Sequence, residues 1–387
     1  MIGLSWPLWV DGDDFPRVPF LRGWPDWPAW CSRVLLAVIA GSLAMAALGR
    51  AWRAGLALGL AGLAVATLGD QDRLQPWAYQ FGLLDLAMVS ASKPRALALG
   101  RMSAIGLYAY SGLSKLDVSF ATELGPTFLA AGLGLVGASP TGWPGWLRTT
   151  AILAMPAWEV AVALGLGFRR TRRLALFAAI AQHSALLAIL GPWSLGHSPN
   201  VLVWNGAMIV EDWLLFANSP GGPAASDRER WPGRLASLVV VVALILPAGE
   251  RSGLFDSWPS HALYASHCER TEILAHEDDA ERFPEAIRRR LGPADLDGWR
   301  RLDLTGWSRD VRGVPIYPQG RVGSGIAEAL AARWGGVHPL RVIQWGRADP
   351  VDGRRPRVEC VGLRAIRRRG GRYWVNAHPS GPGRTAP

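Results

Sequence analysis

The stretch Ala96–Phe120, ALALGRMSAIGLYAYSGLSKLDVSF, decides the fold of this chain. Only one charged residue, Arg101, interrupts residues 96–114, so this run is apolar enough to enter a membrane as a helix. The run ends at Lys115, one of only two lysines in the sequence. The stretch therefore predicts a helix that begins in an apolar layer and ends at a cationic side chain.

The composition extends this prediction to the whole chain. Half of the 387 residues are hydrophobic, 19% are charged and 20 are tryptophan, a residue enriched where a membrane meets water. An integral membrane protein follows, with the lipid bilayer as its first partner. The formal net charge of +10 comes from an excess of arginine, and we expect these arginines to set the membrane topology and to bind anionic lipid. We expect no nucleic-acid binding, because no basic module interleaved with aromatic residues occurs.

Eight apolar segments indicate membrane-spanning helices, although several are shorter than the roughly 20 residues that cross a bilayer and the third or eighth could be re-entrant. They cover residues 34–49, 54–69, 77–92, 96–114, 148–168, 174–191, 200–217 and 235–249. We predict a mainly α fold, a polytopic membrane helical bundle of about eight spans followed by a small α+β extracytoplasmic domain. The predicted segments are an N-terminal interfacial segment (1–33), a transmembrane domain (34–249), an α+β domain (250–375) and a disordered tail (376–387).

Basic connections alternate with connections that are poor in basic residues, which predicts the orientation because short basic loops stay in the cytoplasm. The basic groups are Arg50 and Arg53; Lys93 and Arg95; Arg169, Arg170, Arg172 and Arg173; and Arg228, Arg230 and Arg234. Both termini are then extracytoplasmic, and the protein lies in the cell (inner) membrane. The N-terminus lacks the basic start and apolar core of a signal peptide, so we expect it to be retained.

Ionisable side chains inside the spans mark a candidate polar membrane site, since a charge there usually faces a partner or a wet cavity. They are Asp85, Lys115, Glu159 and His183. The rise of a helix places Glu159 and His183 near the middle of the membrane on consecutive spans. Pro156 is expected to open the backbone near Glu159. His183 is either a satisfied polar core residue or a ligand.

Lys115 shares one helix face with Tyr108, Ser111 and Gly112, by their spacing of three, four and seven residues. Gly112 would allow a neighbouring helix or a ligand to approach this face closely. Tyr108 therefore joins the candidate site.

Three interpretations of Lys115 remain open. It snorkels to the outer interface beside Asp117, forms a structural ion pair with Glu159, or takes part in ligand binding or proton transfer. Asp85 has a simpler alternative, an ion pair with Arg101, because both would lie in the inner half of neighbouring spans.

Polar residues of two outer connections form a second candidate group at the outer mouth of the bundle. They are Gln75, Trp77, Tyr79, Asn200, Trp204 and Asn205. Turn capping and anchoring at the interface explain the same residues without a ligand.

The motif YAYSGLSKLDVSF, followed about forty residues later by MPAWE, resembles the DoxX and MauE group of small bacterial membrane proteins. The order lysine, glutamate, histidine also resembles, more weakly, the transmembrane (HTTM) domain of vitamin K-dependent gamma-carboxylases. The first resemblance implies a redox-associated membrane protein in which Glu159 matches the proline and glutamate element. The second implies that Lys115 falls on a lysine that deprotonates a reduced quinone, so the resemblance implies a quinone as a possible cofactor.

Two departures limit what these resemblances imply. Many MauE-like proteins carry cysteines for a dithiol relay, whereas this chain has no cysteine in the spans after Cys31. The large lumenal domain of the carboxylases is not matched, so we do not expect carboxylation of glutamate.

The region after the last span is polar and arginine-rich, with strand-like and helical stretches that suggest a compact α+β domain. A stripe of Ile326, Leu330 and Trp334 predicts one amphipathic helix. The histidines lack ligand-like spacing and we expect no metal site from them; they are His261, His267, His276, His338 and His378. Cys268 and Cys360 can pair only in an oxidising compartment.

Three functions remain open, and no catalytic signature makes the chain a stand-alone enzyme. The first is a DoxX or MauE-like protein that binds a quinone or lipid-like molecule in a redox-associated or envelope process. The second is a non-enzymatic membrane anchor that displays the C-terminal domain to a protein partner. The third, a transporter, is disfavoured because no internal repeat is detected.

Overall fold

The computed structural model describes residues 1–12, 14–217 and 231–380. Its contacts divide the chain into two compact units. Unit 1 comprises Met1, Pro76–His267 and Ala348–Arg354, and unit 2 comprises Ile2–Gln75, Cys268–Arg347 and Arg355–Pro387. These units group the chain differently from the four predicted segments, which stay predictions. The predicted basic connection at Arg228 and Arg230, and residues 381–387 of the predicted tail, lie outside the described residues.

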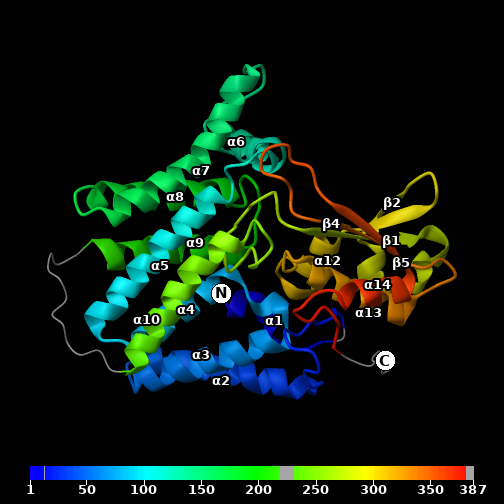
Figure 1. Cartoon of the computed structure of the whole chain (residues 1–387), viewed down its shortest axis with the longest axis horizontal. Coiled ribbons are helices and arrows are strands. Elements are labelled where there is room, and N and C mark those ends of the chain that lie inside the picture. Colours follow the sequence, from blue (N-terminus) through cyan, green and yellow to red (C-terminus); the bar gives the residue numbers. More distant parts are fainter. Residues whose placement is uncertain (13, 218–230, 381–387) are drawn as a thin grey trace. The chain divides into compact units, whose positions relative to one another are not determined.

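Unit 1 is built from helices (Figure 1). They are α4 (Pro76–Ser90), α5 (Lys93–Leu113), the π-helical η3 (Phe120–Leu124), α6 (Gly125–Gly134), α7 (Gly145–Gly167), α8 (Arg172–Leu190), α9 (Pro199–Phe216), α10 (Trp231–Ile245) and the 3₁₀ turn η4 (Leu246–Gly249). Helix α5 packs against α7 and α9, and α8 packs against α7 and α9. The core they share contains Tyr108, Val162, Leu166, Ala179 and Phe216, all buried.

Five helices in the described ranges are long and apolar enough to cross a membrane, by length and composition. They are Ala29–Ala47, Trp52–Gly69, Gly145–Gly167, Arg172–Leu190 and Trp231–Gly249. The other three predicted spans form the helices α4, α5 and α9, which are shorter or less apolar. The chain is thus a mostly helical protein with several membrane-length helices, and the number eight is not confirmed.

Unit 2 combines a helical hairpin with an α+β part (Figure 1). Its helices are η1 (Gly3–Ser5), α1 (Trp6–Trp9), α2 (Ala29–Ala47), α3 (Trp52–Gly69), η2 (Gln71–Arg73), η5 (Glu277–Arg282), α11 (Glu285–Arg288), α12 (Leu304–Arg312), α13 (Gly320–Trp334) and α14 (Gly362–Gly370). Its strands are β1 (Arg270–His276), β2 (Leu291–Ala294), β3 (Trp299–Leu302), β4 (Arg341–Trp345) and β5 (Arg357–Val361). They form one antiparallel sheet in the order β2-β3-β1-β4-β5.

The hairpin of α2 and α3 depends on glycines at the helix contact. A Cβ atom on Gly55 would lie 2.6 Å from the carbonyl oxygen of Ser42, and one on Gly62 would lie 2.7 Å from the side chain of Ile39. Small residues allow two backbones to approach, which is how helices associate where lipid replaces water. The outward side chains, such as Val34 and Leu58, are exposed and apolar, as a lipid-facing helix requires.

The α+β part has its own core. Helix α13 contacts β1 and β4, and the stripe predicted on it is confirmed for Ile326 and Leu330, which are fully buried, while Trp334 is half-buried. Ile273 on β1 and Trp307 on α12 are also buried. All three cysteines are free, so Cys268 and Cys360 do not form a disulfide.

A buried ionic group joins the loop after α3 to the α+β part inside unit 2. The guanidinium of Arg312 donates to Asp72 Oδ2 at 2.7 Å and forms a second ion pair with Asp70. The backbone N–H of Tyr317 donates to Asp72 Oδ1 at 2.6 Å. Because neither carboxylate reaches water, their charges depend on Arg312.

The first residues of the predicted tail are ordered within the same unit. Asn376 and Ala377 are buried, and the amide of Gln71 donates to the Asn376 carbonyl at 2.8 Å. The polar groups of Asn376 thus have partners in the N-terminal segment, and the predicted extent of the tail stays a prediction.

Replacing Arg312 with Ala should lower the free energy of unfolding of the protein by about 3–5 kcal/mol, because Asp70 and Asp72 would stay buried without the guanidinium that pairs with both of them. The measurement is thermal and denaturant unfolding of the full chain in detergent. Arg309→Ala, on the exposed face of the same helix, is the matched control and should have little effect. Equal losses in the two variants would contradict the role of Arg312.

Candidate functional site

Helices α5 and α7 come unusually close where Gly112 faces Pro156. A Cβ atom on Gly112 would lie 2.7 Å from the Pro156 carbonyl oxygen and the same distance from the Val160 side chain. Only glycine fits this approach. Lys115 follows the end of α5 and Glu159 follows Pro156 on α7, so the approach brings their side chains together.

Lys115 forms a buried ion pair with Glu159. Its ammonium group donates to Glu159 Oε2 at 2.9 Å, to Ser111 Oγ at 2.8 Å and to the Leu263 carbonyl at 3.3 Å. The side chains of Lys115 and Glu159 are 7% and 13% exposed. Of the geometries considered for Lys115, the ion pair forms and the snorkelling arrangement does not. A role of Lys115 toward a ligand stays a prediction.

Tyr108, His183 and Asn205 form a continuous hydrogen-bonded chain with Asp212 across α5, α8 and α9. The Tyr108 hydroxyl lies 2.5 Å from Asp212 Oδ2 and 2.7 Å from His183 Nε2. His183 Nδ1 lies 2.8 Å from Asn205 Oδ1. All four side chains are buried, so the chain connects three helices without direct access to solvent.

The donors of this chain define where its protons lie. The amide nitrogen of Asn205 donates to the Val201 carbonyl, so Asn205 Oδ1 accepts and His183 Nδ1 must carry a proton. If Tyr108 donates to Asp212, then His183 is an imidazolium and Asp212 a carboxylate. If Tyr108 donates to His183, then His183 is neutral and Asp212 is a carboxylic acid. Both arrangements hold equal numbers of protons, so a proton can pass between Asp212 and His183 through Tyr108 at constant total charge.

Glu211 lies beside Asp212 and is held by its own partners. Gln80 on α4 donates to Glu211 Oε2 at 2.7 Å, and the Trp204 indole donates to Gln80 Oε1 at 2.9 Å. Within the described ranges, Glu211 Oε1 and Asp212 Oδ1 are buried and have no hydrogen-bond partner. Two adjacent carboxyl groups therefore each leave one acceptor oxygen for a donor from outside the chain.

Asp85 stays apart from this group. It is half-buried on α4 and forms no ion pair in the described part of the chain. The alternative pairing with Arg101 is not formed, because the Arg101 guanidinium donates to the Leu215 carbonyl at 2.6 Å.

The grouping of the outer-mouth candidates stays a prediction, and the structure gives the partners of several of them. Trp204 and Asn205 belong to the networks above, whereas Gln75 belongs to unit 2 and caps a turn of its own segment. The ring of Tyr79 lies 6.0 Å from that of His261, and Asn200 is buried at the start of α9.

Sequence reasoning missed Glu211 and Asp212. Their signal was present as two adjacent carboxylates in AMIVEDWLLF, within an otherwise apolar segment. The four ionisable residues that were selected lie on other helices, and nothing in the sequence spacing places Asp212 beside Tyr108.

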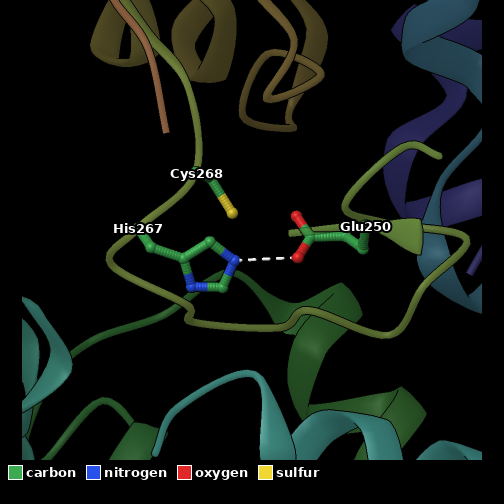
Figure 2. Close-up of side chains that lie close together, drawn as sticks. All are labelled: Glu250, His267 and Cys268. Atoms are coloured by element: carbon green, nitrogen blue, oxygen red, sulfur yellow. Dashed lines mark hydrogen bonds and ion pairs between the residues drawn. The ribbon is translucent and has the colours of Figure 1, made fainter. Parts of the chain in front are cut away.

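His267 lies between two carboxylates at the end of unit 1. Its Nδ1 is 3.0 Å from Asp117 Oδ2 and its Nε2 is 2.9 Å from Glu250 Oε2. Figure 2 shows the imidazole facing Glu250, together with the side chain of Cys268, the next residue. Each ring nitrogen faces a carboxylate oxygen, so a protonated His267 donates to Asp117 and Glu250 at the same time.

Comparison with protein-family models, with curated proteins and with solved structures finds no match for this chain. The resemblances to the DoxX and MauE group and to the carboxylase transmembrane domain therefore stay predictions.

Replacing Gly112 with Ala should destabilise the protein by about 1–3 kcal/mol, because the added methyl group overlaps the Pro156 carbonyl and forces α5 and α7 apart. Thermal unfolding in detergent measures the effect. Gly134→Ala is the matched control, since a Cβ atom at Gly134 meets nothing within 4 Å. An unchanged melting temperature for Gly112→Ala would refute the close approach.

The stability of the protein should fall as pH rises above about 6.5, because of His267. Burial opposes the charged imidazole, but hydrogen bonds to Asp117 and Glu250 outweigh it and raise the pKa of His267 above its usual 6.5. This stabilisation is complete below pH 6.5 and is lost as pH rises through the raised pKa. Melting temperatures between pH 5 and 9 test the expectation, and His267→Gln should flatten the curve. The same slope in both proteins would count against it.

Proposed function

We propose that this multi-pass membrane protein binds a quinone or another lipid-like molecule with a polar head in unit 1, in a redox-associated or envelope process. The observation that carries the proposal is the buried chain Asp212–Tyr108–His183, beside two carboxyl oxygens without partners. Such an arrangement suits a ligand that offers hydroxyl donors and exchanges protons.

A quinol and a quinone differ by two electrons and two protons, so their binding site needs groups that accept and donate protons. Asp212 and Glu211 supply acceptors for a quinol hydroxyl, and the chain through Tyr108 connects Asp212 to His183. Lys115 and Glu159 form a second polar group on α5 and α7. The source of electrons belongs to a partner, because the described part of the chain offers no dithiol.

The side chains around the hydrogen-bonded residues Asp212, Tyr108 and His183 are apolar, which favours a ligand with an apolar part. Tyr108 belongs to a core of Val162, Leu166, Leu176 and Phe216. A small ionic substrate would lose its hydration in such surroundings without compensation.

We place the protein in the cell (inner) membrane with about eight spans and both termini extracytoplasmic. Support comes from unit 2, in which the connection after α3, predicted to be outside, packs with the C-terminal α+β part. One side of the membrane must therefore hold both, as the arginine pattern requires.

The alternative function, an anchor that displays the C-terminal domain to a protein partner, has weaker support. Its simplest form requires that the region after the last span folds alone. Arg312 and Arg321 of that region donate to Asp72 and Gln71 of the N-terminal region, so separation would leave both arginines buried without these partners.

The test is the ligand content of the full-length protein purified in mild detergent. Organic extraction and mass spectrometry should recover a quinone or a lipid-like molecule from the wild type. Tyr108→Phe and Asp212→Asn should each reduce retention about 10–100-fold, because a hydrogen bond to a charged group contributes about 1.5–3 kcal/mol.

Tyr110→Phe is the matched control. It lies two residues away on α5 and donates only to the Leu244 carbonyl, so it should retain the ligand. Equal ligand content in wild type, Tyr108→Phe and Asp212→Asn, with all of them folded, would rule out the proposed site.

A further inference from the structure

Two histidines that are far apart in sequence lie together in the α+β part of unit 2. His276 ends β1, and His338 lies in the connection between α13 and β4. Their imidazole rings are stacked, with centroids 3.8 Å apart and planes 23° apart. Asp278 follows His276 in the turn η5 and faces both rings. The sequence shows no metal-ligand motif at these residues, because they are far apart along the chain and only the folded structure brings them together.

The three side chains offer ligand atoms at short mutual distances. One ligand atom from each lies within 4.8 Å of the other two. His276 Nδ1 lies 3.3 Å from Asp278 Oδ2, and His338 Nδ1 lies 4.0 Å from the same oxygen. Zinc bonds of about 2.0–2.1 Å in a tetrahedron separate ligand atoms by about 3.3 Å. His276 and Asp278 are already at this separation, whereas the stacked rings must rotate apart before His338 binds the same cation.

The two ring nitrogens nearest Asp278 have only weak partners, which a cation would displace. His276 Nδ1 accepts the backbone N–H of Asp278 in a long hydrogen bond of 3.4 Å. His338 Nδ1 is buried, forms no hydrogen bond within the described ranges and lies 3.4 Å from Asp279 Oδ2. Two stacked imidazoles repel each other when both are charged, whereas neutral imidazoles are the form that binds a metal.

The backbone around the two histidines is fixed by Asp279. Its carboxylate accepts the backbone N–H groups of Val337 at 3.1 Å and His338 at 2.8 Å, which holds the connection after α13 beside the end of β1. Gly336 allows this contact, because a Cβ atom there would lie 2.1 Å from Asp279. Asp279 thus positions the backbone of His338, and its Oδ2 also lies 3.4 Å from His338 Nδ1.

We propose that His276, His338 and Asp278 bind one divalent transition cation of the Zn²⁺ type. Two imidazoles and one carboxylate match the ligand preference of zinc. Asp278 is exposed and both histidines are half-buried, so the fourth position is open to water or to a ligand atom from another molecule. The cation would clamp the end of β1 to the connection after α13.

The test uses the full chain in detergent, freed of metal and titrated with Zn²⁺. Equilibrium dialysis with elemental analysis should find about one Zn²⁺ per chain, with a rise in melting temperature on binding. His276→Gln and His338→Gln should abolish this binding. Asp279→Asn should weaken it about 10–100-fold, as loss of a supporting group does. His378→Gln, in the same unit, should bind as the wild type does.

A spectroscopic measurement keeps the proposal falsifiable if a histidine variant folds poorly. Co²⁺ in place of Zn²⁺ should give the visible bands of a low-symmetry, four-coordinate site in the wild type, and Zn²⁺ should remove them. The absence of these bands, or zinc binding that survives in folded His276→Gln and His338→Gln, would overturn the proposal. Zinc binding that is lost in His267→Gln alone would also overturn it, by placing the metal elsewhere.

Discussion

The ammonium group of Lys115 is buried between apolar helices, and Glu159, 2.9 Å away, supplies its counter-charge. Removing a charge from water costs several kcal/mol, and the remaining partner suffers that cost when its counter-charge is lost. The ion pair therefore ties α5 to α7, and the contact of Gly112 with Pro156 fixes how close the two helices come. Helix α5 also carries Tyr108, so the position of the hydrogen-bonded chain Asp212–Tyr108–His183 depends on the same contact.

The same constraint organises unit 2. Asp70 and Asp72 lie at the end of a membrane-length helix, and Arg312 lies at the end of α12. Arg312 forms an ion pair with each carboxylate, which makes the α+β part a partner of the N-terminal hairpin. Asp117 and Glu250 likewise stabilise the positive charge of a protonated His267 imidazole, and this charge is lost when the imidazole is deprotonated at higher pH.

Periodicity and composition were sufficient to predict where the helices lie in the sequence, but not which side chains contact one another. The apolar runs predicted the positions of the helices, and the stripe on α13 predicted its buried face, because both depend on local spacing. The partners of Tyr108 could not be predicted, since Asp212 and His183 come from two other helices. His276 and His338 likewise meet only through the order of the strands. The location of Asn376 depends on contacts with the N-terminal segment, which the polar tail sequence does not reveal.

Unit 2 is assembled from both ends of the chain, and this has a consequence for biogenesis. The hairpin α2–α3 leaves the ribosome first, but Arg312, Arg321 and the sheet follow only after all of unit 1 has been made. Until then the ion pairs of Asp70 and Asp72 with Arg312 cannot form. Contacts of such large sequence separation form slowly. Unit 2 can therefore be completed only after the last strand has been synthesised.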